Sequence, residues 1–66
     1  MKTYELDIVT EERSLEVAIK EINRIEGVTI ILTAPNGLGS GWPTVVAAVT
    51  DEALPKLEEW YGSKIV

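Results

Sequence analysis

A glycine-rich loop from Asn36 to Pro43 holds the residues whose types and spacing most suggest a binding site. Its sequence is N-G-L-G-S-G-W-P, with glycine at alternate positions. Dinucleotide-binding loops have the pattern G-x-G-x-x-G between a strand and a helix, whereas here Trp42 replaces the third glycine and an apolar strand follows. No Lys-Ser or Lys-Thr pair completes a phosphate loop either. The pattern predicts either a nest of backbone N–H groups for a small anion or a hairpin loop whose glycines adopt positive φ.

Side chains suited to catalysis are scarce. The chain has no cysteine and no histidine, which excludes disulfides, thiolate metal sites and the commonest general base near neutral pH. Adjacent acids such as Glu11 and Glu12 diverge on a helix and do not converge on a substrate. Glu5 and Asp7 share a strand face, but two carboxylates alone make a weak cation site. We therefore predict a protein that is not an enzyme and that has no cofactor and no metal.

The length and charge of the chain limit its class further. Its 66 residues predict a single small domain, 1–66, whose hydrophobic core is small enough that self-association would help to stabilise it. The formal net charge of −5 argues against a nucleic-acid partner, which would need a basic patch. The first residues lack the apolar core of a signal peptide, and no apolar run reaches the length of a membrane span. We expect a cytoplasmic protein with no membrane partner.

Hydrophobic periodicity predicts five elements. Alternation of apolar and polar residues indicates strands, and an apolar residue at every third or fourth position indicates helices. The predicted strands are 3–9, 28–34 and 44–49, and the predicted helices are 14–26 and 51–61. Residues 63–66 are a candidate for a short fourth strand. Within the strand 28–34, alternation places Val28, Ile30 and Leu32 on one face and Ile31 on the other.

The order of elements predicts the fold. A β-α-β-β-α sequence, with an optional final β, is typical of an α/β (α+β) domain of the split βαβ, ferredoxin-like type. The helix between the first two strands makes a crossover, and the hairpin then inserts the third strand between them. The result is an antiparallel sheet with two helices on one face and an open second face.

Two surfaces of this fold are candidates for binding. Trp42 in the glycine loop either folds back over the core or is offered to a partner, since tryptophan is enriched at binding hot spots. The open sheet face would present Ile31 beside acidic residues, with Val46 or its neighbours, depending on the register of the third strand. The candidate partner- or ligand-binding residues are Asn36, Gly37, Leu38, Gly39, Ser40, Gly41, Trp42 and Ile31.

The loop, the strand after it and the segment D-E-A-L from Asp51 to Leu54 resemble small uncharacterised proteins of bacteria and phages with an N-G-x-G-x-G-x-P loop. That resemblance implies the βαββα fold and no known activity. A looser similarity is to ACT-type regulatory domains, in which a glycine loop lies near an amino-acid site. Their loop usually follows the first strand, whereas here it joins the second and third. The ACT-type similarity implies a ligand pocket at a dimer interface, lined by Gly37, Gly39, Ser40 and Gly41.

These observations predict a small protein-interaction module. It would form a homodimer or bind a larger protein partner, using the open sheet face and the loop around Trp42. The alternative is a small-molecule-binding regulatory module that uses the glycine loop.

Overall fold

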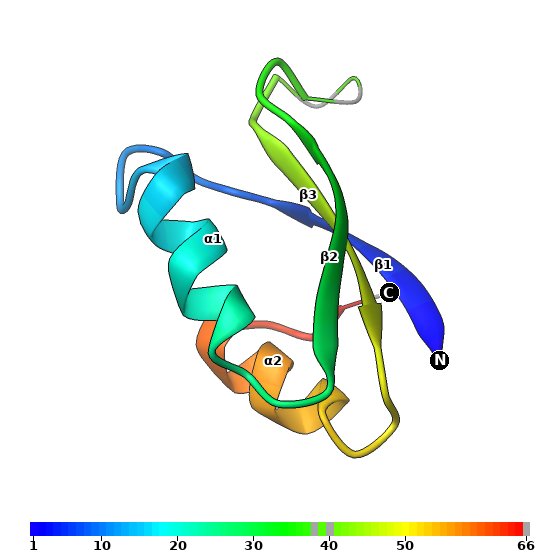
Figure 1. Cartoon of the computed structure of the whole chain (residues 1–66). Helices are drawn as coiled ribbons and strands as arrows, with labels where there is room; N and C mark the ends of the chain where they lie inside the picture. Colours follow the sequence, from blue (N-terminus) through cyan, green and yellow to red (C-terminus); the bar gives the residue numbers. More distant parts are fainter. Residues whose placement is uncertain (38, 40, 66) are drawn as a thin grey trace.

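The computed structural model describes residues 1–37, 39 and 41–65. Its elements follow the predicted order, and their bounds are β1 Lys2–Asp7, α1 Leu15–Asn23, β2 Val28–Ala34, β3 Thr44–Val49 and α2 Leu54–Tyr61 (Figure 1). Residues 63–65 form no strand, so the optional fourth strand is absent from the described residues. Val66, which was part of that prediction, lies outside them. No helix in the described part of the chain is long and apolar enough to cross a membrane.

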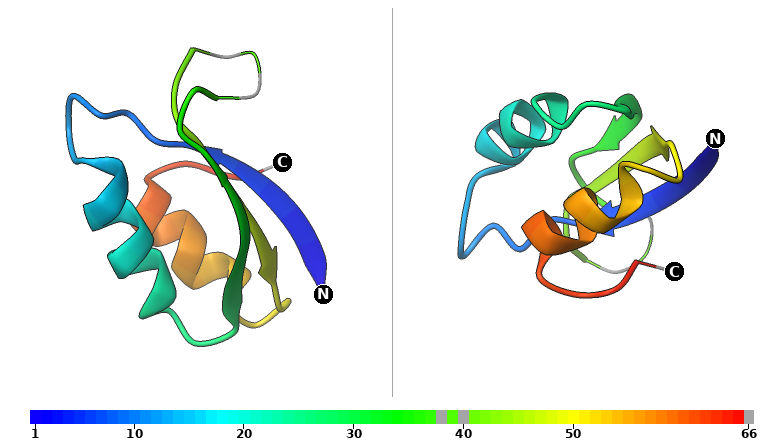
Figure 2. Two further views of the ribbon diagram at one scale, coloured as in Figure 1. Left: turned by 45° about the horizontal axis from the view of Figure 1, so that its top comes forward. Right: turned by 90° about the horizontal axis from the view of Figure 1, so that it is seen from below.

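The sheet has the predicted topology. Its strand order is β1-β3-β2, and β3 pairs antiparallel with both neighbours, so β1 and β2 run parallel to each other. Both helices cover the same face of the sheet (Figure 2). The ferredoxin-like, split βαβ prediction is therefore confirmed. Pairing of Glu5 with Val46 and of Tyr4 with Ala47 also settles the register that the sequence leaves open. Val45, Ala47 and Val49 face the helices, and Val46 lies on the open face.

The hydrophobic core lies between the sheet and the two helices. Its buried side chains come from all five elements and the segments beside them, and they are Leu6, Ile8, Ala18, Ile22, Val28, Val45, Ala47, Val49, Ala53 and Leu57. Leu6, Ile22 and Leu57 are the largest of these with no exposed surface. The aromatic residues of α2 pack against the edge of this cluster.

Local hydrogen bonds explain where the helices begin and end. The Ser14 hydroxyl accepts the Val17 N–H at 3.3 Å, which makes Ser14 the N-cap of α1. The second helix begins at Leu54, three residues later than the predicted start at 51. Residues 51–53 form a turn in which the Thr50 hydroxyl accepts the Ala53 N–H at 3.2 Å. Pro55 lies in the first turn of α2. A proline is tolerated there because the N–H groups of the first turn have no carbonyl partner within the helix.

The helix α1 is also shorter than the predicted range 14–26. It ends at Asn23, and Arg24 is its C-cap. The chain then makes a tighter turn, in which the Ile25 N–H donates to the Ile22 carbonyl oxygen three residues before it. Gly27 follows with positive φ and leads the chain into β2.

One sequence prediction about β2 is wrong. Leu32 was expected on the core side with Val28 and Ile30, but it pairs with Val46 of the open face and is 53% exposed. The pairing register shifts between Ile30 and Leu32, so Ile31 is an extra residue in the strand. Such a bulge reverses the alternation of all residues that follow it.

Candidate functional site

The open face of the sheet is the first candidate surface. Val46 and Ala48 of the central strand β3 lie on it and are only partly buried. Opposite them on β1 are Thr3 and Glu5, and Leu32 of β2 pairs with Val46 from the other side. The face is thus acidic along β1 and apolar along β2.

The β-bulge makes the β2 side of this face more apolar than the sequence predicts. Ile31 is 58% exposed and its neighbour Leu32 is 53% exposed. The whole of β2, with the sequence VTIILTA, has no charged residue. Exposed edge strands usually carry charges that discourage pairing with other chains, as β1 does with Lys2 and Glu5. Ile31, a predicted site residue, therefore belongs to a two-residue exposed apolar patch on an uncharged edge.

The glycine loop connects β2 to β3 at the end of the hairpin that lies away from α2 (Figure 1). Asn36 is exposed in a turn, and Trp42 is partly buried but is not among the side chains that pack against the described core. Gly37, Gly39 and Gly41 all have positive φ. Leu38 and Ser40, which were also predicted site residues, lie outside the described residues.

Gly37 has a structural role that accounts for its position. Its φ is +79°, and a Cβ added there would collide with the Trp42 carbonyl oxygen. Its N–H donates to the Ala34 carbonyl oxygen at 2.9 Å, which closes the turn after β2. The two ends of the loop therefore approach each other through a residue that has no side chain. Ile31 lies about 10 Å of extended strand before the end of β2 at Ala34, and Asn36 lies in the turn after it, so the two residues belong to different parts of the hairpin.

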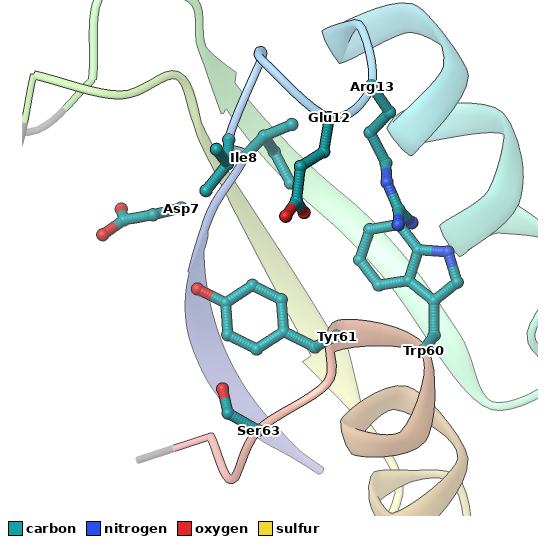
Figure 3. A pocket seen from close by; sticks show the side chains of 8 residues that line it. Asp7, Ile8, Glu12, Arg13, Trp60, Tyr61 and Ser63 are labelled. Carbon is teal, nitrogen blue, oxygen red and sulfur yellow. The ribbon is translucent and has the colours of Figure 1, made fainter.

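The structure also contains a cavity that sequence reasoning missed. Its volume is about 210 Å³, and it opens between the end of β1, the connection to α1 and the end of α2 (Figure 3). The residues that line it are Asp7, Ile8, Val9, Glu12, Arg13, Trp60, Tyr61 and Ser63. None of them belongs to the glycine loop. The Asp7 carboxylate accepts the Thr44 hydroxyl at 3.3 Å, which ties this edge of the cavity to β3.

One wall of the cavity is a small network of charged and aromatic side chains. The Arg13 guanidinium lies 4.8 Å from the centre of the Trp60 ring, a cation–π contact. The same guanidinium is 3.4 Å from Glu21 Oε1, and the Trp60 indole N–H donates to that oxygen at 3.4 Å. The Trp60 and Tyr61 rings are stacked with their centres 6.5 Å apart. Glu21 thus holds Arg13 and Trp60 together from α1.

Within the described residues there is no group of three or more acidic side chains placed to hold a metal ion. The adjacent aromatic residues Trp60 and Tyr61 are a sequence feature that could have pointed to this cavity. Their partners could not be found from spacing, because Glu21 and Trp60 are 39 residues apart and meet only when α1 packs beside α2.

No protein-family model matches the chain, and no curated protein or solved structure shows significant similarity to it. The function of this chain must therefore be inferred from its own surfaces.

Proposed function

We propose that the chain is a protein-interaction module that self-associates through the open face of its sheet. The observation that supports this most directly is the patch of Ile31 and Leu32, which are 58% and 53% exposed on a strand without any charge. Exposed apolar patches on small domains often mark contact sites. The partner in this proposal is a second copy of the chain.

The apolar patch alone does not supply enough free energy to hold a dimer together. Full burial of an isoleucine or leucine side chain contributes about 1.5–3 kcal/mol, and roughly half of each is still exposed here, so each would add about 1 kcal/mol. A symmetric dimer covers four such side chains, which adds about 4 kcal/mol. Association costs at least that much in lost freedom of motion, so Val46 and Ala48 must be covered as well. A standard interface of about 800 Å² per copy would take about a fifth of the 4429 Å² surface.

The acidic side chains favour one orientation of the two copies. Glu5 lies on β1, and the opposite edge strand β2 is uncharged. A two-fold axis parallel to the strands lays β1 of one copy over β2 of the other, which separates the carboxylates. An axis across the strands would stack β1 on β1 and bring like charges together, which is unfavourable.

The test is the solution mass, measured by sedimentation or light scattering from low micromolar to near millimolar concentration. Ile31→Glu and Leu32→Glu should each raise the dimer dissociation constant about a hundredfold or more, because burying an unpaired carboxylate costs several kcal/mol. Val17→Glu is the matched control, since Val17 is 46% exposed on α1, away from the sheet. A wild-type chain that stays monomeric over the whole range would refute self-association.

The other functions predicted from the sequence call for different measurements. Binding of a larger protein partner would appear as an unchanged monomer that is captured through the same patch. The small-molecule regulatory alternative predicts a ligand that raises the unfolding temperature and loses that effect in Gly39→Val. The cytoplasmic location, the lack of a nucleic-acid partner and the lack of enzymatic activity also stay predictions.

A further inference from the structure

The cavity beside Trp60 has a second feature besides its aromatic wall. Glu12 comes from the connection between β1 and α1, and its carboxylate points toward the space in front of the Tyr61 and Trp60 rings (Figure 3). The positive charge that lines the same cavity, Arg13, is already matched by Glu21 at 3.4 Å. The Glu12 charge is therefore not neutralised by the other charged side chains of this wall.

The chain itself shows which chemical group suits this wall. The Arg13 guanidinium lies 4.8 Å from the Trp60 ring centre, within the range of about 6 Å in which cations are attracted to aromatic faces. A positive group is thus stable against one face of the Trp60 ring. The cavity in front of the Trp60 and Tyr61 rings has a volume of about 210 Å³. That is smaller than the pockets of about 300–1,000 Å³ that hold drug-sized ligands, which suits a small cation on a short stem.

We infer that this cavity binds an organic cation, an alkylammonium or guanidinium group on a short apolar stem. Glu12 supplies the charge, the Tyr61 ring supplies the cation–π face, and Ile8 and the Trp60 ring line the cavity beside the stem. An anion would meet the Glu12 carboxylate, and among the described residues no group of three acidic side chains is placed to hold a bare metal ion. This site is separate from the open sheet face and does not depend on self-association.

The test uses Trp60 as its own reporter. The chain has two tryptophans, so Trp42→Phe leaves Trp60 as the single indole. The indole N–H signal of Trp60 is followed by NMR while N-acetyl-arginine amide is added. The matched ligand is N-acetyl-citrulline amide, which has nearly the same shape and no charge. We expect a saturable shift with the arginine compound and at least about fivefold weaker binding of the citrulline compound, because one charge pair about 4 Å apart in water is lost.

A pair of variants tests the role of Glu12. Glu11 and Glu12 are neighbours and both are exposed, but only Glu12 lines the cavity. Glu12→Gln should weaken binding of N-acetyl-arginine amide about fivefold for the same reason, and Glu11→Gln should leave it nearly unchanged. Since both side chains are exposed, neither change should unfold the chain.

Two further probes identify the source of the cation. Tighter binding of the tripeptide acetyl-Gly-Arg-Gly-amide than of agmatine assigns the site to an arginine side chain of a protein. Tighter binding of agmatine assigns it to a free amine. The inference is overturned by a shift that does not saturate, by equal binding of the citrulline compound, or by equal effects of Glu11→Gln and Glu12→Gln.

Discussion

Gly37 is required by the hairpin loop for two separate reasons, and a matched pair of substitutions separates them. Its φ of +79° is costly for any residue with a Cβ, and that Cβ would also collide with the Trp42 carbonyl oxygen. Gly39 has a φ of +110° but nothing within 4 Å of an added Cβ. Alanine at Gly39 therefore adds backbone strain alone, whereas alanine at Gly37 adds strain and a steric conflict with backbone.

The expected losses follow from these two terms. Placing a residue other than glycine in the left-handed region costs about 1–2 kcal/mol, which is the whole effect expected for Gly39→Ala. In Gly37→Ala the Trp42 backbone must also move, which weakens the turn closed by the Gly37 N–H and disturbs the start of β3, so we expect about 2–4 kcal/mol. A domain of this size has roughly 3–10 kcal/mol of stability, so this loss would be a large fraction of it.

Urea unfolding followed by circular dichroism measures both variants. The free energies of unfolding of the two variants should differ by at least about 1 kcal/mol. In thermal unfolding, each kcal/mol corresponds to a change of about 4–8 °C in melting temperature for a domain of this length. Equal losses for the two variants would show that the approach of Gly37 to Trp42 contributes nothing. A Gly37→Ala variant as stable as the wild type would refute the described loop geometry altogether.

Two further predictions concern the helices. Leu57→Ala should lower the free energy of unfolding by about 2–5 kcal/mol, because Leu57 is fully buried between α2 and the sheet. Urea unfolding measures this loss, and a loss below about 1 kcal/mol would contradict the described core. Glu21→Ala should lower the free energy of unfolding by only about 1 kcal/mol, because the Arg13 and Glu21 side chains are 35% and 39% exposed and water screens the ion pair. The same substitution should shift the NMR signal of the Trp60 indole N–H, which donates to Glu21. An unchanged signal would contradict that hydrogen bond.

The order and pairing of the elements could be predicted because they depend on local patterns. Alternation in the first strand places Leu6 and Ile8 on one face, and the same rule assigns Val45, Ala47 and Val49 to one side of β3. A helix between two strands and a hairpin after them leave few ways to build one sheet, so the β1-β3-β2 order followed.

Helix ends were predicted less well than strands. The helix α2 starts at Leu54 and not at the predicted position 51, because the Thr50 hydroxyl accepts a hydrogen bond in a turn that hydrophobic periodicity does not detect. The helix α1 ends at Asn23 and not at the predicted position 26, because carbonyl oxygens of its last turn accept hydrogen bonds in a tighter turn before β2. Both differences are local competition for backbone hydrogen bonds, which apolar spacing does not record.

The candidate sites depended much more on tertiary structure. Three apolar residues in succession, Ile30, Ile31 and Leu32, leave the alternation of β2 ambiguous, and only pairing with β3 decided that Leu32 faces outward with Val46. The cavity at Trp60 depends on contacts between residues that are far apart in the sequence.

The sequence by itself determined the strands, the helices and the topology, because side-chain periodicity and turn residues act over a few positions. Only the tertiary structure decided the bulge at Ile31 and the meeting of Arg13, Glu21 and Trp60. Those features arise from the register between strands and from the packing of α1 beside α2. Both depend on long-range contacts that no short stretch of sequence specifies.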